Sequence, residues 1–157
     1  MSVIVLGPSS VDFTASSTVV NTGQMITFTD MSSAGGTAWA WTFGDGGTAT
    51  GQVATHTYTT ATGSPFTVSL TVTYPSPTGN VTTTKPSYIT VNVPLCTVPS
   101  LNNLKFNNAQ AAWNAAGFTG TVTRQFGAPN GNFTIHVQSQ TASLQIVCSS
   151  DVAVTDK

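Results

Sequence analysis

Trp41-Thr42-Phe43-Gly44-Asp45-Gly46-Gly47 alternates aromatic and polar residues and then runs into a glycine-rich turn. Alternate residues of a β-strand point to one face, so this pattern predicts a strand that turns its aromatic side chains towards a core. The Gly-Asp-Gly turn supplies residues that accept a positive φ. A second alternating run, residues 66–72, predicts another strand that follows a short His-x-Tyr segment at 56–58.

Further short runs on both sides of this segment also favour strands. The predicted strands span residues 11–15, 25–30, 37–43, 56–59, 66–74, 81–85 and 88–93. Clusters of Gly, Pro, Asn and Ser separate them, and short strands at this spacing predict a sandwich of two sheets. We expect Trp39, Trp41 and Phe43 to share the face that packs on the core.

The order of these motifs resembles the PKD family, whose domains are immunoglobulin-like β-sandwiches. The resemblance covers residues 10–93, and its motif residues are Trp41, Phe43, Gly44, Asp45, Gly46, His56 and Tyr58. It implies a structural role for this motif, with His56 bonding across the sandwich. It also implies an extracellular or surface module, a class in which catalysis is rare.

The composition excludes several kinds of partner. Charged residues make up 6% of the chain, against about a quarter in an average globular domain. There is no glutamate, and there are 29 threonines, which suit half-exposed strands. A net charge of −1 gives no electrostatic footprint for nucleic acid, and no apolar run is long enough for membrane insertion. Weak repulsion between copies favours assembly, although an ordinary extracellular composition explains the low charge equally well.

Residues 1–9 precede the predicted sandwich and form an N-terminal arm. Its central residues Val3, Ile4, Val5 and Leu6 are apolar and mostly β-branched. Two alternatives are open for this arm: an additional edge strand on its own sandwich, or strand addition to a neighbouring subunit. The arm is too short for a signal peptide, so we expect either a removed signal or another route out of the cell.

Residues 94–157 form a second predicted unit. Apolar residues at helical spacing predict a helix over 107–116, with Asn107 or Asn108 at its N-cap and Gly117 just beyond its end. Three strands are predicted at residues 121–126, 132–139 and 149–155.

This second unit resembles a PASTA-type domain, a small fold with one helix packed on three strands. The matching segments are Val98-Pro99-Ser100-Leu101, Ala109-Gln110-Ala111-Ala112, Ala115-Ala116-Gly117-Phe118 and Gln138-Ser139-Gln140. The chain departs from the pattern because the usual proline after the Gln-Ser step is missing and two cysteines are added. The resemblance implies peptidoglycan as a ligand.

Cys96 and Cys148 lie near the two ends of the second unit. We expect a disulfide, because the composition is typical of extracellular proteins and a small domain benefits from a covalent link. On the chain-entropy account such a bridge contributes about 4 kcal/mol. The alternative is a pair of buried free thiols, and the absence of neighbouring histidines argues against zinc.

Few residues could carry chemistry. A carboxylate pair for sugar hydrolysis would have to come from Asp30 and Asp45, and a calcium site from Asp12, Asp30 and Asp151 with loop carbonyls. No Gly-x-Ser-x-Gly motif is present, and neither His56 nor His136 has a metal ligand nearby in the sequence. We predict no catalytic residue, no metal site and no cofactor.

Trp39, Trp113 and Phe126 could form a platform for sugar rings, but we expect core packing for each. The sequence therefore predicts a mainly β chain with an immunoglobulin-like sandwich followed by a small α+β domain.

We expect a non-enzymatic structural or surface protein that acts in assembly or adhesion on a virion or an extracellular filament. Its partners would be copies of itself or other surface or virion proteins, and its place the outside of a cell or virion. The alternative is a carbohydrate- or peptidoglycan-binding accessory module.

Overall fold

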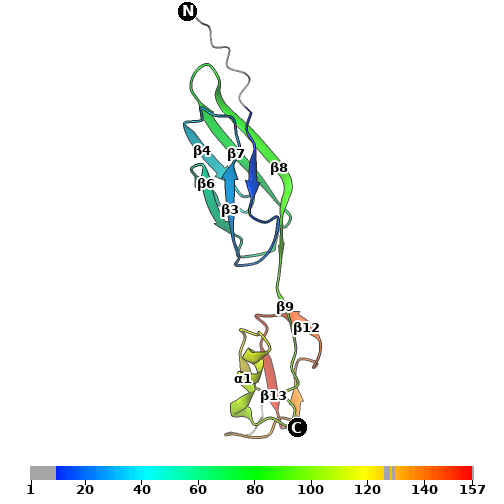
Figure 1. Ribbon diagram of the computed structural model, residues 1–157. Helices are drawn as coiled ribbons and strands as arrows, with labels where there is room; N and C mark the ends of the chain where they lie inside the picture. The colour runs from blue at the N-terminus through cyan, green and yellow to red at the C-terminus, as the bar shows by residue number, and fades with distance from the viewer. Residues whose placement is uncertain (1–9, 126–127, 129, 157) are drawn as a thin grey trace, which may run out of the picture. The chain divides into compact units, whose positions relative to one another are not determined.

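The computed structural model describes residues 10–125, 128 and 130–156 (Figure 1). The chain divides into two compact units between Val93 and Pro94. Each unit has a hydrophobic core of its own. The predicted N-terminal arm lies outside the described residues.

Unit 1 is a sandwich of two β-sheets. Its strands are β1 (Phe13–Ala15), β2 (Val19–Asn21), β3 (Met25–Asp30), β4 (Ala38–Thr42), β5 (Thr48–Thr50), β6 (Val53–Thr57), β7 (Phe66–Tyr74) and β8 (Gly79–Asn92). One sheet has the order β1-β3-β6 and the other the order β2-β8-β7-β4-β5 (Figure 1). Buried and exposed residues alternate along β7, so each sheet turns one apolar face inward. The predicted mainly β, immunoglobulin-like fold is confirmed.

The core of unit 1 is aromatic. Trp41 lies edge-on to Phe13 with ring centroids 5.3 Å apart, and Phe28 contacts Phe43 at 4.9 Å. Trp41 and Phe43 are buried as predicted, but Trp39 is only partly buried. An indole N–H requires a hydrogen-bond partner, and the boundary of the core is where this side chain finds one.

Two predicted strand boundaries in unit 1 are wrong. β6 spans Val53–Thr57 rather than 56–59, because its extent is set by pairing with β3, which is distant in sequence. The two strands predicted at 81–85 and 88–93 are a single strand, β8, and its register against β7 shifts around Pro86 and Ser87. Proline lacks an N–H, so the ladder is interrupted there without ending the strand.

The sequence does not predict β2 and β5. Each is three residues long, too short to show a period of its own. β2 pairs in parallel with the end of β8, and β5 pairs with β4. Both therefore exist through their partners rather than through a local pattern.

Unit 2 combines one helix with short strands. Its elements are β9 (Leu95–Thr97), α1 (Phe106–Ala115), β10 (Val122–Arg124), β11 (Val137–Gln138), β12 (Gln145–Val147) and β13 (Val152–Thr155). Three strands form a sheet in the order β10-β13-β11, and β9 pairs with β12. The predicted helix is found within one residue, and the three predicted strands are shorter than expected. β9 and β12 are not predicted by the sequence.

The start of α1 differs from the prediction. Neither Asn107 nor Asn108 caps the helix; Lys105 occupies the N-cap position without a side-chain cap. Instead, the Asn107 N–H donates to Oδ1 of Asn132, 3.1 Å away and 25 residues further on. A free helix N–H needs an acceptor, and a distant segment supplies it. Gly117 follows the helix with φ +90°, as predicted.

Candidate functional site

The motif residues of unit 1 meet at the turn between β4 and β5. Oδ1 of Asp45 accepts the Gly47 N–H at 2.9 Å, and Oδ2 lies 2.8 Å from Nε2 of His56. The His56 ring stacks on Phe43 with centroids 4.2 Å apart. The Tyr58 hydroxyl donates to the Phe43 carbonyl at 2.9 Å. Since β4 and β6 belong to different sheets, these contacts tie the two sheets together.

Two glycines shape this turn. Gly44 and Gly46 have φ values of +86° and +93°, in the region that favours glycine. A Cβ on Gly44 would lie 2.5 Å from the Thr67 carbonyl oxygen, whereas a Cβ on Gly46 would meet nothing within 4 Å. Gly44 is therefore needed both for its positive φ and for the close contact with Thr67, whereas Gly46 is needed for its positive φ alone.

The surroundings of this cluster shift the pKa values of Asp45 and Tyr58 in opposite directions. Partial burial acts to raise the pKa of Asp45, but the Gly47 N–H and His56 together outweigh it, so this pKa lies below its ordinary value. Burial, and then the nearby Asp45 charge, raises the pKa of Tyr58. At neutral pH the carboxyl is ionised and the phenol is neutral, which suits a structural cluster better than general acid–base catalysis.

The two carboxylates considered for sugar hydrolysis have different partners. Asp45 is bound in the turn described above. Oδ2 of Asp30 accepts the Trp39 indole N–H at 2.7 Å, and its Oδ1 accepts the Ser32 N–H at 2.9 Å. Each is occupied in holding the backbone or a ring, and the structure records no contact between the two.

The three aspartates considered for calcium are also separately engaged. Oδ1 of Asp12 lies 2.8 Å from Nζ of Lys85, and this side-chain bond, with the Phe13 N–H, lowers the pKa of Asp12. Asp151 belongs to unit 2 and accepts the Thr121 N–H at 2.6 Å, which lowers the pKa of Asp151. Within the described residues no group of three or more His, Cys, Asp or Glu side chains could hold a metal ion.

The aromatic residues considered as a sugar platform do not come together. Trp113 is fully buried in unit 2 and stacks on Phe118 with centroids 4.0 Å apart. Trp39 belongs to unit 1 and is half-buried, and Phe126 lies outside the described residues. His136 is exposed beside the buried Ile135, and the following Val137 is exposed as well.

A different aromatic group, which the sequence does not predict, lies on unit 2. Phe106 and Phe133 stack with ring centroids 5.3 Å apart, and the Arg124 guanidinium lies 4.7 Å from the Phe106 centroid. Nη2 of Arg124 donates to the Gly131 carbonyl at 3.0 Å. We call Phe106, Arg124 and Phe133 the arginine–aromatic stack. No local spacing connects its members, so only the fold could assemble it.

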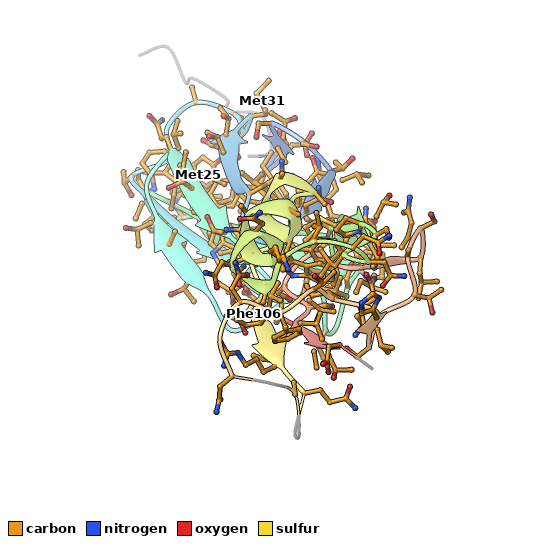
Figure 2. The ribbon with its side chains drawn as sticks, turned by 90° about the horizontal axis from the view of Figure 1, so that it is seen from below. Met25, Met31 and Phe106 are labelled. Carbon is orange, nitrogen blue, oxygen red and sulfur yellow. A yellow bond between two sulfur atoms is a disulfide. The ribbon has the colours of Figure 1, made fainter. Side chains whose placement is uncertain are left out.

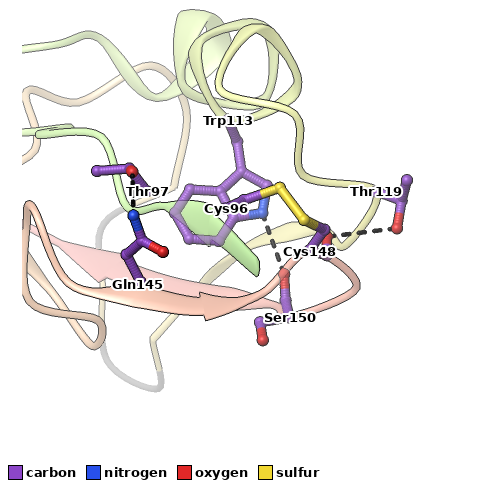
Figure 3. The surroundings of a disulfide bond; sticks show 7 residues. All are labelled: Cys96, Thr97, Trp113, Thr119, Gln145, Cys148 and Ser150. Carbon is purple, nitrogen blue, oxygen red and sulfur yellow. Dashed lines mark hydrogen bonds between the residues drawn. A yellow bond between two sulfur atoms is a disulfide. The ribbon is translucent and has the colours of Figure 1, made fainter. Parts of the chain in front are cut away.

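Cys96 and Cys148 form a disulfide, which confirms the predicted bridge and excludes the free thiols. The bridge joins β9 to the residue after β12 beside the buried Trp113 (Figure 3). The Trp113 indole N–H donates to the Ser150 carbonyl at 3.1 Å, and the Thr119 N–H donates to the Cys148 carbonyl at 2.8 Å. Stable disulfides are typical of extracellular proteins.

The edge of the first sheet at β1 is closed by side chains of β8. Hydroxyl, ammonium and phenol groups there bond main-chain groups of the β1 segment that point away from β3. The pairs are Thr83 with the Val11 carbonyl, Lys85 with the Phe13 carbonyl and Tyr88 with the Ala15 N–H. An incoming strand would find these groups already occupied.

The edge of the second sheet at β2 is closed in a similar way. The Val19 N–H donates to the Ser17 hydroxyl at 3.3 Å, and the Asn21 N–H donates to Oε1 of Gln24 at 2.6 Å. Side-chain acceptors that follow or precede the strand thus take the place of a neighbouring strand.

The edge of the first sheet at β6 is open. The Asp30 N–H donates to the Gln52 carbonyl at 2.8 Å, so these two residues form a hydrogen-bonded pair. Bonded and non-bonded pairs alternate along an antiparallel ladder, so the pairs that contain Val53, Thr55 and Thr57 are non-bonded. The N–H and C=O groups of Val53, Thr55 and Thr57 therefore point away from β3. Among the described residues no hydrogen bond to these groups is recorded. We call these three residues the β6 edge.

In the described part of the chain, no helix has the length and apolar character needed to cross a membrane.

Comparison with known proteins identifies unit 1. The PKD1 domain of Vibrio anguillarum Epp is 26% identical over 55% of this chain and 98% of its own length, with a TM-score of 0.43. The PKD1 domain from the Vibrio cholerae metalloprotease PrtV is 28% identical over 51% of this chain and 94% of its own, with a TM-score of 0.40. No curated protein matches the chain. The family model of the PKD domain matches residues 8–91, more than half of the sequence. The chain therefore belongs to the PKD domain family.

Proposed function

We propose that this chain is a non-catalytic part of an extracellular surface protein and that it mediates protein–protein assembly on a filament or virion. The PKD domain is a non-catalytic module that is often found in adhesion or surface proteins. The disulfide and the low charge fit the same setting. The observation that carries the proposal is the β6 edge, because an unpaired strand edge is a template for another chain.

The outer face of the five-stranded sheet supports the same role. It carries hydroxyls in cross-strand pairs and no charged side chain: Ser69 and Thr84 lie 2.8 Å apart, as do Thr71 and Thr82. Like charges that meet when copies associate disfavour association. This face presents none, so copies can approach without electrostatic repulsion.

Light scattering tests the proposal directly. We expect the full chain to form species larger than a monomer at micromolar concentrations, and Thr55→Lys to reduce them to a monomer, because edge lysines oppose strand pairing. Thr141→Lys adds the same charge to an exposed loop position of unit 2, which belongs neither to the β6 edge nor to this face, and should leave the mass unchanged. A monomeric wild type at all concentrations would contradict the proposal, as would a Thr55→Lys variant that assembles normally.

A second candidate function is glycan binding by unit 2, for which we propose a PASTA-like identity. Two of the segments that carry that resemblance meet in the structure: Oε1 of Gln138 accepts the Leu101 N–H at 2.7 Å, and Nε2 donates to the Pro99 carbonyl at 3.2 Å. The arginine–aromatic stack offers a flat cationic surface for a carboxylated sugar or peptidoglycan.

Sedimentation with purified peptidoglycan tests this second candidate. We expect Arg124→Ala to lose binding while Lys105→Ala, which removes a charge outside the stack, retains it. Equal binding by both variants would remove the stack from consideration, and no binding by the wild type would remove this function.

A further inference from the structure

We propose that the β6 edge receives the N-terminal arm of a second copy of this chain, through residues Val3 to Leu6. The inference rests on the proposed assembly function and names the partner. The acceptor strand β6 belongs to the described residues, whereas the arm lies outside them.

The β6 edge lacks the features that normally prevent strand addition. Its strand reads Val-Ala-Thr-His-Thr, with no lysine, no proline and no acidic residue. Its register against β3 runs without a shift, so no bulge turns the edge away. Natural sheets protect their edges with these devices. Their absence from β6 contrasts with β1 and β2, whose outward groups are occupied by side chains of the same domain.

The outer side of the edge carries exposed apolar side chains at its two ends, with threonines between them. Val53 is 59% exposed, and Met25, opposite Thr57 in the register, is 69% exposed. Met25 is one of the residues labelled in Figure 2. On the inner side of the same strand, Ala54 is buried at the margin of the core. An added strand would thus meet Val53 on its outer face and Ala54 on its inner face, where His56 pairs with Asp45 further along the strand.

The arm has the composition that such an edge requires. Val3, Ile4, Val5 and Leu6 are all apolar, so alternate side chains are apolar on both faces of an extended strand. The arm contains no charge and no proline before Pro8. Four residues also suit a short acceptor, since β6 is five residues long. Main-chain hydrogen bonds would supply affinity, and the side chains would set the register.

The position of the arm's attachment favours a second copy. The described chain begins at Ser10, whose carbonyl accepts the Ser33 N–H at 2.9 Å, and it continues directly into β1. β1 and β6 are the two opposite margins of one sheet, with β3 between them. The edge next to the arm is closed, and the open edge lies on the far side of the sheet.

Such a contact joins different surfaces on the two partners. The donor contributes its arm and the acceptor its β6 edge, so every subunit that receives an arm can still donate its own. A contact of this heterologous kind does not close by two-fold symmetry and instead builds rings or open filaments.

Complementation between two assembly-deficient variants tests the inference. Val5→Lys puts a charge into the arm and leaves the β6 edge intact, whereas Thr55→Pro blocks the edge and leaves the arm intact. The Thr55 N–H points outward, so the proline removes no bond within the domain and is tolerated at such a position. We expect each variant alone to be a monomer by light scattering, and their equimolar mixture to form a species of two chains.

Amide hydrogen exchange on the full chain gives a second readout. The amides of Val53, Thr55 and Thr57 should exchange slowly in the assembled wild type and at least tenfold faster in the Val5→Lys monomer. Thr141→Lys, in an exposed loop of unit 2, should assemble and protect these amides like the wild type. Should Thr55→Pro fail to fold, Thr55→Lys takes its place in the mixture.

The outcomes separate this inference from the proposed function. If Val5→Lys assembles like the wild type while Thr55→Lys does not, the edge binds something other than the arm and only the inference falls. A mixture that remains monomeric overturns the inference in the same way. A monomeric wild type with protected β6 amides means that the arm pairs with its own domain, which overturns both.

Discussion

Residues of the Asp45 turn link the two sheets of unit 1 although several of them are partly exposed. Asp45, His56 and Tyr58 link the turn after β4 to β6 by side-chain bonds, while Gly44 lets the backbone approach Thr67 closely. A position that needs both positive φ and lack of a side chain is more restrictive than one that needs positive φ alone. These two requirements can be separated experimentally.

Gly44→Ala and Gly46→Ala form a matched pair. Both put a side chain at positive φ, which costs roughly 1–2 kcal/mol. Gly44→Ala also places its Cβ against the Thr67 carbonyl, so we expect a further loss of about 1–3 kcal/mol from overpacking. Chemical denaturation monitored by tryptophan fluorescence measures the free energy of unfolding of unit 1 in both variants. Equal losses would show that the turn shifts to accommodate the methyl group.

Asp45→Asn tests the electrostatic contribution of the turn. The pKa of Asp45 is lower in the folded state than in the unfolded chain, so its ionised form stabilises the fold. That stability is fully present above the unfolded pKa of about 3.9 and is lost as pH falls through the folded pKa. We expect the variant to be about 1 kcal/mol less stable at pH 7. Its difference from wild type should shrink below pH 4, as urea unfolding at several pH values would reveal; a difference that persists there contradicts this origin.

Among the elements, the edge strands differ in how their outward groups are satisfied. β1 relies on three side chains of β8, and β2 on Ser17 and Gln24. β6 has no such partners among the described residues, and neither has β5 at the other edge of the five-stranded sheet. The distinction follows from the alternation of main-chain bonds along an antiparallel pair, and it predicts opposite responses at neighbouring positions of β6.

Proline substitutions at Thr55 and Ala54 should differ sharply. The Thr55 N–H points outward, so Thr55→Pro removes no ladder bond and we expect a loss below about 1 kcal/mol. The Ala54 N–H faces Phe28 of β3, so Ala54→Pro leaves a buried carbonyl unpaired at a cost of about 1–3 kcal/mol, beyond the steric effect. Thermal unfolding by circular dichroism compares them. Equal destabilisation would show that the ladder alternates in the opposite sense.

At the level of the whole molecule, the chain consists of two units with separate cores and different means of stabilisation. Unit 1 has a large aromatic core. Unit 2 has a smaller core around Trp113 and the Cys96–Cys148 bridge, whose cysteines are 52 residues apart. A small core barely offsets the conformational entropy that the chain loses on folding. We therefore expect the bridge to contribute to the stability of unit 2 and not to that of unit 1.

Replacing both cysteines by serine should unfold unit 2 selectively. The lost constraint on the unfolded chain is worth about 4 kcal/mol, comparable to the whole stability of a domain this small. The indole N–H resonances in NMR spectra report on each unit: Trp113 should move to its unfolded position, while Trp39 and Trp41 should keep theirs. Reduction of the wild type provides the same comparison without mutation. Retention of the folded Trp113 signal would contradict the prediction that unit 2 depends on the disulfide for its stability.

The alternation along β4 and β7, the glycine turn and the helix around Trp113 are visible in the sequence, because each depends on neighbours a few residues away. From them the sequence determined the β-sandwich, the resemblance that the PKD family match bears out, the presence of α1 and the cysteine pair. Short contacts along the chain suffice for such features.

The tertiary structure alone decided what depends on distant partners. β2 and β5 exist by pairing, the cap of α1 comes from Asn132, and the arginine–aromatic stack joins three separate segments. The same holds for the sheet edges. Whether a backbone N–H points into a ladder or towards solvent depends on register, and register is a property of two strands rather than of one. Only the fold could therefore show that β1 is closed and β6 is open.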